Sequence, residues 1–389
     1  MTTDTGSERT GPILHNSGVG PSVRPSPAVL KARRERLLAA IAIDGIDVAI
    51  VAPGADLRYL LGDSFPSFER LTALVLGRSV CLLVVPEMEL SAWSTVVSQS
   101  SLEVFAWADW QDPYAVIVDL VGTNSVVAVS HELPARHLVT LQEAVGQAAE
   151  WRLNSAVTSL RGVKDDWEIN QIEGAASAID DVHAAVPGLL RPGRTEAAVA
   201  ADIQHVMREN GFTDSEFIAV ASGPNAANPH HSANARTIER GDLVLVDLSG
   251  RWHGGYFADS TRTYAVSTPL PETARAYAAL LRSFECAVSA VKPGVTAQQV
   301  DLAARNELSE HGLAELFIHR TGHGIGLDVH EDPSLVRGNE ELLRDGMAFT
   351  IEPGIYLPGR FGARIEDVVV MTNGVARQLN ARPHELLVV

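Results

Sequence analysis

An internal repeat constrains the fold of this chain more than any other feature of its sequence. The segment LRPGRTEAAVAADIQHVMRENG aligns with VKPGVTAQQVDLAARNELSEHG at a constant offset, so that Pro192 matches Pro293 and Gly211 matches Gly312. Each copy opens with Pro-Gly, places a Thr before an apolar-periodic stretch and closes on Gly, which is the pattern of a capped helix. The repeat therefore predicts two similar halves packed about a pseudo-twofold axis.

Two strand-like runs repeat in the same way. A glycine precedes Asp247 at the same separation as another glycine precedes Glu352, and both intervals are filled by strand-forming residues. Asp247 therefore corresponds to Glu352, and by nearly the same shift Asp259 corresponds to Glu366. A pseudo-twofold axis would bring these paired carboxylates together, as a two-metal site requires.

Five residues with metal-binding side chains stand in short apolar or glycine-rich frames that would hold them rigidly. They are Asp247, Asp259, His323, Glu352 and Glu366. In four frames the carboxylate follows or interrupts a strand-like run, and we expect strand ends to aim these ligands. Four carboxylates and one imidazole suit Mn²⁺, Co²⁺, Fe²⁺ or Zn²⁺, and two bridging carboxylates would hold a metal pair. Because such a pair activates a shared water and polarises a carbonyl, the expected reaction is hydrolysis.

The five frames resemble the M24 metallopeptidase family, whose pita-bread domain carries Asp, Asp, His, Glu, Glu in this order around two metal ions. The frames are GDLVLVDLSG, GGYFADSTRTY, HRTGHGIGLDVHE, GMAFTIEPGIY and GARIEDVVVMT. The resemblance covers roughly residue 161 to the C-terminus, and a weaker resemblance to the creatinase-type N-terminal domain covers much of the chain before it. It implies two divalent ions per chain, with Mn²⁺ as the expected metal.

The resemblance also implies a role for each ligand. His323 and Glu352 would bind one ion, Asp247 would bind the other, and Asp259 and Glu366 would bridge them. A metal-bridged hydroxide would attack the peptide carbonyl. Glu352 would then shuttle the proton to the leaving nitrogen.

Further residues match positions that the family uses on the substrate side. His330 would donate to the substrate carbonyl, and His230 in ANPHHSANAR would stabilise the tetrahedral intermediate, while its neighbour His231 would be a bystander. Arg364 would orient the carboxylates, and Thr261 would fix a bridging one. The alternatives are a solvated histidine pair for His230 and a surface ion pair for Arg364.

The substantial domain in front of the repeat resembles the Xaa-Pro peptidases more than the methionine aminopeptidases. A bond to proline lacks the N–H that ordinary proteases hold, and the fixed φ of proline resists extended binding, so a dedicated enzyme is expected. We expect an Xaa-Pro dipeptidase (prolidase) acting on short proline-containing peptides, with aminopeptidase P as the alternative. A catalytically silent pita-bread binding protein and a creatinase-like amidinohydrolase are further alternatives, although both usually lack these ligands.

The group that would read the C-terminal carboxylate of a dipeptide is an open question. Some prolidases carry an arginine shortly after the second histidine, but Ser334 stands at that position here. The nearest arginine is Arg337, and the sequence does not decide whether it reaches the substrate.

Length and composition predict two domains after a tail. Residues 1–27 are rich in Ser, Thr, Pro and Gly and lack an apolar signal-peptide core, so we expect a disordered tail. Residues 28–160 alternate helical and strand-like patterns, such as KARRERLLAAIA and DVAIVA, which predicts an α/β creatinase-like N-terminal domain. Residues 161–389 would form the α+β pita-bread catalytic domain, with a long first helix from about Asp165.

Charge and hydropathy exclude several partners. The net charge of −17, from 31 basic and 48 acidic residues, disfavours binding to nucleic acid. No segment reaches the roughly 18 apolar residues of a membrane span, so we expect no membrane partner and a cytoplasmic location. Cys81 and Cys286 show no disulfide framework. Family relatives are commonly homodimers, and we expect a homodimer here.

Overall fold

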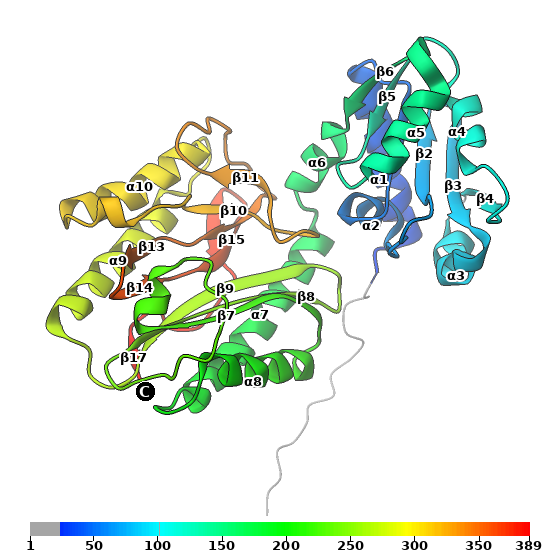
Figure 1. Cartoon of the computed structure of the whole chain (residues 1–389). Coiled ribbons are helices and arrows are strands. Elements are labelled where there is room, and N and C mark those ends of the chain that lie inside the picture. Colours follow the sequence, from blue (N-terminus) through cyan, green and yellow to red (C-terminus); the bar gives the residue numbers. More distant parts are fainter. Residues whose placement is uncertain (1–23, 101) are drawn as a thin grey trace, which may run out of the picture.

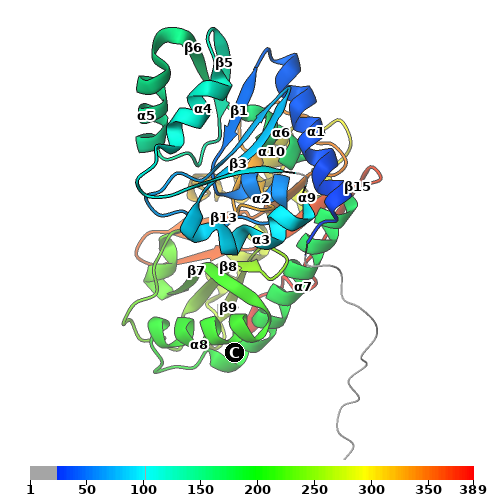
Figure 2. The ribbon, with the colours of Figure 1, turned by 90° about the vertical axis from the view of Figure 1, so that its right-hand side faces the viewer.

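The structure is a computed structural model that describes residues 24–100 and 102–389. It contains two bodies joined through consecutive helices, α6 (Ser155–Gly162) and α7 (Asp166–Leu189) (Figures 1 and 2). Most of the predicted tail, residues 1–27, lies outside the described residues. The first helix begins one residue before the predicted domain start, because Ser26 caps it by accepting a hydrogen bond from the Val29 N–H and Pro27 stands in its first turn.

The N-terminal body is an α/β domain built on one six-stranded mixed sheet of order β4-β3-β2-β1-β5-β6. Its strands are β1 (Val48–Val51), β2 (Ala73–Gly77), β3 (Val80–Pro86), β4 (Glu103–Trp107), β5 (Ser125–Val129) and β6 (Ala149–Leu153). Its helices are α1 (Pro27–Ile43), α2 (Ala55–Leu61), α3 (Leu90–Gln99), α4 (Pro113–Val121) and α5 (Ala135–Val145). Short 3₁₀ helices in this domain are η1 (Glu87–Glu89) and η2 (Gly146–Ala148).

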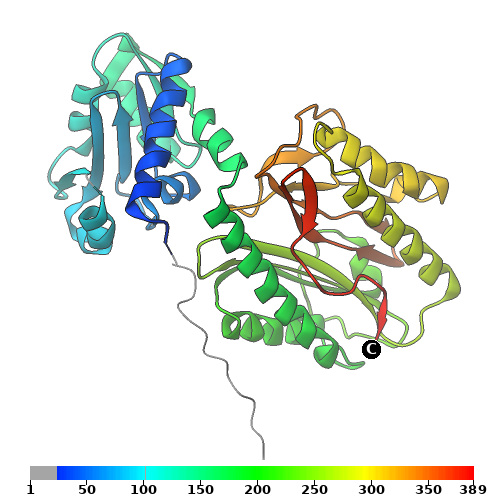
Figure 3. The ribbon, with the colours of Figure 1, turned by 180° about the vertical axis from the view of Figure 1, so that it is seen from behind.

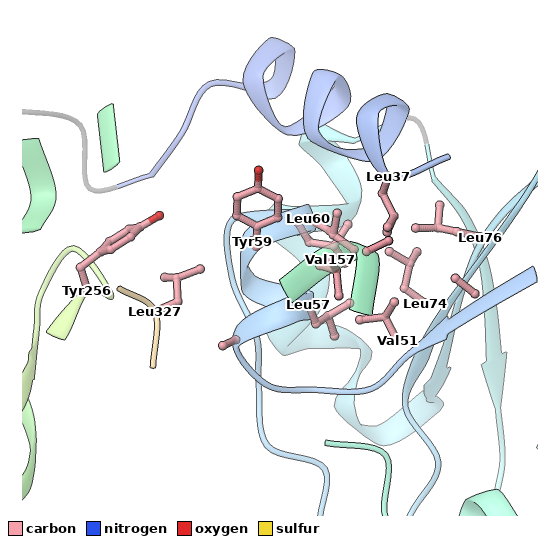
Figure 4. Packing of buried hydrophobic residues seen from close by; sticks show 14 of the residues in the cluster. Leu37, Val51, Leu57, Tyr59, Leu60, Leu74, Leu76, Val157, Tyr256 and Leu327 are labelled. Carbon is pink, nitrogen blue, oxygen red and sulfur yellow. The ribbon is translucent and has the colours of Figure 1, made fainter. Parts of the chain in front are cut away.

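Helices cover both faces of this sheet, so its central strands β1, β2 and β3 are nearly continuous apolar runs. Alternate residues of β1 point to opposite faces, with Val51 in the core beneath α1, α2 and α3 and Ile50 in the core beneath α4 and α5. The first of these cores continues into the C-terminal body through Tyr256 and Leu327 (Figure 4). The two domains therefore share buried apolar surface.

The C-terminal body has a four-stranded sheet of order β17-β9-β8-β7 and a five-stranded sheet of order β11-β10-β12-β15-β16, each covered by a helix pair on its outer side, and a separate two-stranded β13–β14 sheet (Figure 3). The first half contains α7, α8 (Glu196–Glu209), β7 (Phe212–Ser222), η3 (Gly223–Ala227), β8 (Leu243–Trp252) and β9 (Phe257–Ala265). The second half contains α9 (Pro271–Ala290), α10 (Ala297–Glu310), η4 (Ala314–Leu316), β10 (Gly322–Gly324), β11 (Glu331–Leu335), β12 (Ala348–Ile351), β13 (Gly354–Leu357), β14 (Phe361–Arg364), β15 (Asp367–Thr372) and β16 (Val375–Gln378). The last strand, β17 (Leu387–Val388), returns to pair with β9 in the sheet of the first half.

The predicted internal repeat is confirmed in detail. Thr195 and Thr296 are the N-caps of α8 and α10, and each also forms an isolated β-bridge, to Thr237 and to Leu342. The glycines that precede the two ligand-bearing strands both adopt positive φ, +94° at position 241 and +87° at position 346, which glycine tolerates without a steric penalty. The predicted fold class, an α/β domain followed by a pseudo-symmetric α+β domain, is therefore confirmed.

Several predicted elements are also confirmed, and others were missed. The long helix starts at Asp166 with Asp165 as its cap, and the helix expected from the KARRERLLAAIA segment is α1. The elements α2, α4, α5, β4 and β6 of the N-terminal domain were not predicted. None of the helices among the described residues is long and apolar enough to cross a membrane.

A buried ion cluster connects the two domains. Arg161 in α6 donates to Asp56 of the N-terminal domain at 2.7 Å and to Asp328 and Glu331 of the C-terminal domain at 2.6 Å each. Lys164 donates to the other oxygen of Glu331 at 2.9 Å. Because Glu331 is buried between two cations, their attraction outweighs its desolvation and holds its pKa at about 2.

We predict that Glu331→Gln lowers the free energy of unfolding by about 3 kcal/mol at neutral pH, since it leaves the buried Lys164 without its carboxylate partner and removes one of the three carboxylates around Arg161. The depressed pKa of Glu331 means that the unfolded chain takes up this proton more readily than the folded one. The stabilisation is therefore complete above the unfolded pKa of about 4.5 and is lost as the pH falls toward 2. Urea unfolding of both proteins between pH 7 and about pH 3 measures this difference.

The exposed Glu340 offers a matched control for this experiment. Glu340→Gln is expected to change stability by less than about 0.5 kcal/mol at any pH. A difference between wild type and Glu331→Gln that stayed constant over the whole pH range would contradict the assigned pKa.

Candidate metal centre

The β8–β9 hairpin carries the two aspartates on one face. Asp247 pairs with Thr261 and Ser249 pairs with Asp259, so the aspartates are diagonal neighbours on adjacent strands. The expectation that ligands stand at strand ends is wrong for these two. They lie inside their strands, because the hairpin continues to pair beyond them as far as Arg251 and Phe257.

The other three ligands come from the second half. His323 lies in β10, at a point where its pairing with β11 shifts register. Glu352 directly follows β12, and Glu366 directly precedes β15, two residues after Arg364 at the end of β14. Here the expectation of ligands at strand ends is correct.

The structure brings all predicted site residues to one cavity of about 870 Å³. Its walls include Asp247, Asp259, His323, Glu352, Glu366, His230, His330 and Arg364. Ligand atoms of Asp259, His323 and Glu366 lie within 4.8 Å of one another, and His323 Nε2 is 3.4 Å from Glu352 Oε1. Asp247 stands outside this tight group, where its carboxylate accepts a hydrogen bond from Arg364.

The buried carboxylates repel one another. Burial raises the pKa of Asp259 well above its usual range, and the nearby charges of Glu366 and Asp247 raise it further. Burial and the charges of Glu352 and Asp247 do the same to Glu366. One carboxylate oxygen of Asp247 and one of Asp259 are also buried without any hydrogen-bond partner among the described residues. Such a group of anions is stable in ionised form only with cations between its members.

His323 is prepared to act as a neutral ligand. Burial lowers its pKa to about 3, so the ring is uncharged at neutral pH. Its Nδ1–H donates to the Gly324 carbonyl at 2.9 Å, which leaves the Nε2 lone pair facing Asp259 at 3.6 Å and Glu352 at 3.4 Å. A lone pair opposite two anions is repulsive unless a cation lies between them. The side chains therefore fit divalent metal ions.

Arg364 and Thr261 hold the carboxylates in place. The guanidinium of Arg364 donates to Asp247 and, through Nε, to the Thr261 hydroxyl at 3.0 Å. Thr261 in turn donates to Glu366 Oε2 at 2.6 Å. This chain of contacts connects one aspartate of the first half to one glutamate of the second half. The predicted neighbours of the ligands therefore touch them, although their functional roles stay predictions.

The same network extends to two residues that the sequence reasoning missed, Tyr356 and His319. Arg364 Nη1 can only donate, so the Tyr356 oxygen accepts its hydrogen bond at 2.7 Å and donates its own proton to His319 Nε2 at 2.9 Å. His319 Nδ1 then donates to the Arg320 carbonyl at 2.7 Å. Tyr356 is the last residue of the frame GMAFTIEPGIY, and His319 is the first residue of the frame HRTGHGIGLDVHE. Their positions in the same frames as two candidate ligands could have indicated that they lie near the site.

The histidines on the substrate side differ in their environments. His330 packs edge-on against His323, with ring centroids 4.3 Å apart, and burial lowers its pKa. His230 is exposed and lines the cavity. Its neighbour His231 contacts Glu196 at 2.7 Å, which gives it a structural partner. Two imidazoles, those of His230 and His330, therefore line the same cavity as the candidate metal ligands.

The duplicated fold and its buried ligand set are those of a metal-dependent peptidase. Residues 170–373 match the model of metallopeptidase family M24, and residues 33–163 match the creatinase/prolidase N-terminal domain. The chain belongs to metallopeptidase family M24, as its motifs predicted.

Solved structures and curated relatives agree with this assignment. Dipeptidase PepE from Mycobacterium ulcerans is 48% identical with a TM-score of 0.89, and the match covers 94% of this chain and 99% of that one. A recombinant prolidase from Thermococcus sibiricus is 34% identical with a TM-score of 0.87, over 92% and 99% of the two chains. The Xaa-Pro dipeptidase of Lactobacillus helveticus is 35% identical over 340 residues, or 84% of this chain and 90% of that one.

We predict that Thr261→Val weakens divalent metal binding about 10-fold to 100-fold while the fold is retained, because Glu366 loses its hydrogen bond and Arg364 loses an acceptor. Calorimetric titration of chelator-treated protein with Mn²⁺ measures the dissociation constant. Thr273→Val, at a buried threonine in α9 away from the cavity, is the control and is expected to leave the constant unchanged. Equal affinities for all three proteins would contradict the role of Thr261.

Proposed function

We propose that this chain is a dinuclear-metal-dependent Xaa-Pro dipeptidase, a prolidase that cleaves short proline-containing peptides. The observation that carries the proposal is the convergence of three buried carboxylates, the half-buried Glu352 and a neutral His323 on one cavity that is large enough for a small peptide. Two of the similar proteins described above are named as dipeptidases and one as a prolidase, which supports this substrate class.

In this proposal His323 and Glu352 would hold one ion and Asp247 the other, and Asp259 and Glu366 would help to hold the pair. Bound metal ions supply Lewis acidity, which lowers the pKa of water and polarises the peptide carbonyl. We propose Mn²⁺ as the metal, with Co²⁺, Zn²⁺ and Fe²⁺ as alternatives. Oxygen-rich sites with one imidazole accept each of these ions, so the donor set alone does not select among them.

The protein side chains orient the substrate and move the proton. Glu352 accepts a proton from the attacking water and passes it to the leaving nitrogen. His330 and His230 donate hydrogen bonds to the carbonyl oxygen and to the tetrahedral intermediate. Arg364, fixed between Asp247 and Thr261, keeps the carboxylates in the geometry that the metal ions require.

Aminopeptidase P is the second candidate, because it would use the same metal centre on longer peptides. A silent binding protein or a creatinase-like amidinohydrolase fits less well, since all five ligand side chains are present and converge on one cavity. A homodimer and a cytoplasmic location stay predictions, and light scattering tests the first of them.

We predict that Mn²⁺-loaded protein cleaves the dipeptide Ala-Pro with a higher kcat/KM than the tripeptide Ala-Pro-Ala, and that chelation abolishes both activities. Comparison of initial rates on the two peptides, with and without chelator, measures this. Preference for the tripeptide would identify an aminopeptidase P instead. Chelator-sensitive hydrolysis of other dipeptides without cleavage of either proline peptide would reject the proline specificity but keep the metallopeptidase.

We predict that Glu352→Gln keeps the fold but lowers kcat by about 10²-fold to 10⁴-fold, the usual contribution of a general acid or base. Circular dichroism and a Mn²⁺ titration show whether folding and metal binding persist. The exposed Glu340→Gln variant is the matched control and should retain wild-type turnover. Near-normal turnover by Glu352→Gln would mean that another group moves the proton.

A further inference from the structure

A second cavity adjoins the catalytic one on the side of the N-terminal domain. It has a volume of about 380 Å³, and Arg320 and His330 belong to the walls of both cavities. The far wall of the second cavity includes His131 and Glu132 of the N-terminal domain. Arg320 therefore stands where the catalytic cavity meets the space closed by the other domain.

Arg320 is also distinguished by its charge balance. Among the described residues, three arginines line the two cavities: Arg161, Arg320 and Arg364. Arg364 donates to Asp247, and Arg161 is surrounded by the three carboxylates of the ion cluster between the domains. Arg320 has no carboxylate within 4.0 Å in the described part of the chain, although it is half-buried. Of these three arginines, Arg320 is therefore the one whose positive charge has no carboxylate partner among the described residues.

The position of Arg320 is well defined. Its Nη1 donates to the Ser334 hydroxyl at 3.2 Å, and its backbone carbonyl accepts the hydrogen bond of His319 Nδ1 at 2.7 Å. The next residue, Thr321, donates its backbone N–H to Leu335 at 2.9 Å. The guanidinium is therefore held at the cavity wall while most of its donors stay available to a ligand.

Arg320 lies on the side of the site where the leaving group must be. Arg320 lines the same cavity as Glu352, and its partner Ser334 pairs with His323 across β10 and β11. In the proposed function Glu352 gives its proton to the leaving nitrogen, so the leaving residue lies beside Glu352. In a dipeptide that residue ends in a carboxylate, which is an anion of the right size for an unpaired guanidinium.

We propose that Arg320 binds the C-terminal carboxylate of a dipeptide substrate and that Ser334 positions its guanidinium. The inference rests on the proposed function and assigns the group that makes the enzyme prefer dipeptides. It also answers the question that the sequence left open. Ser334 stands where some prolidases have an arginine, and here its hydroxyl accepts a hydrogen bond from Arg320, which lies in the loop before β10. Arg337 is exposed and lines neither cavity.

The test compares Ala-Pro with Ala-Pro-NH₂, which differ only in the charge of the C-terminal group. The full-length, Mn²⁺-loaded Arg320→Met variant should lose about 10²-fold in kcat/KM on Ala-Pro, mainly through KM, because one partner of a charged pair is removed. Its activity on the amide should change less than about 3-fold, since a neutral amide gains little from a guanidinium. Arg320→Lys should recover part of the preference for the acid.

Two control variants make the result specific. Arg337→Met removes a nearby exposed arginine and is expected to leave both substrates unaffected. Ser334→Ala keeps the charge of Arg320 but removes its hydrogen bond, and it should lower the preference for the acid by a few-fold.

The outcomes separate this inference from the proposed function. Wild-type protein that cleaves neither Ala-Pro nor its amide would overturn the proposed function together with the inference that rests on it. Wild-type cleavage of Ala-Pro, combined with an Arg320→Met variant that keeps the acid-to-amide ratio, would overturn the inference alone. An equal loss on both substrates would do the same, because it would show a merely structural role for Arg320.

Discussion

Mutual repulsion among buried carboxylates is the constraint on which the rest of this structure depends. Asp259 and Glu366 are nearly inaccessible to solvent, and burial together with neighbouring charge raises the pKa of each. Arg364 compensates part of this charge through Asp247, but one guanidinium does not balance four carboxylates. The fold therefore holds ligand atoms close together at an energetic cost that bound cations offset. Stability and metal affinity are linked at this point of the molecule.

The internal repeat explains how a chain places such a costly group. Each half contributes a capped helix and a strand that begins after a glycine with positive φ, so each half delivers its carboxylates from a rigid element. The halves are not equivalent in detail. The aspartates lie inside a long hairpin, whereas each glutamate stands next to the end of a strand. The carboxylates of the two halves therefore start from backbone positions at different distances from the centre. A longer side chain at a strand end and a shorter one inside a strand can then meet at the same centre.

The sequence predicted what is encoded by local pattern and by chain order. The repeat, the long helix after Asp165 and the convergence of the five candidate ligands on one cavity were all predicted, because helix caps, apolar periodicity and motif spacing are local properties. The network through Tyr356 and His319 was not visible, since it depends on which side chains from separate segments meet in space. The length of the hairpin beyond Asp247 was also missed. The strand pairs with β9 as far as Arg251 and ends at Trp252, so Asp247 lies inside it and not at its end.

The segment from His323 to Glu331 links the chemistry of the site to the docking of the two domains. It supplies one ligand, His323, then the cavity residue His330, and then Glu331, which is buried between Arg161 and Lys164 at the start of the C-terminal domain. Because Glu331 directly follows His330, a shift of Glu331 would also move His330 and the cavity wall to which it belongs. None of the five candidate ligands lies in the N-terminal domain, but this domain fixes Arg161 through Asp56 and closes the space beyond Arg320. Residues of both domains therefore shape the cavity next to the candidate metal centre.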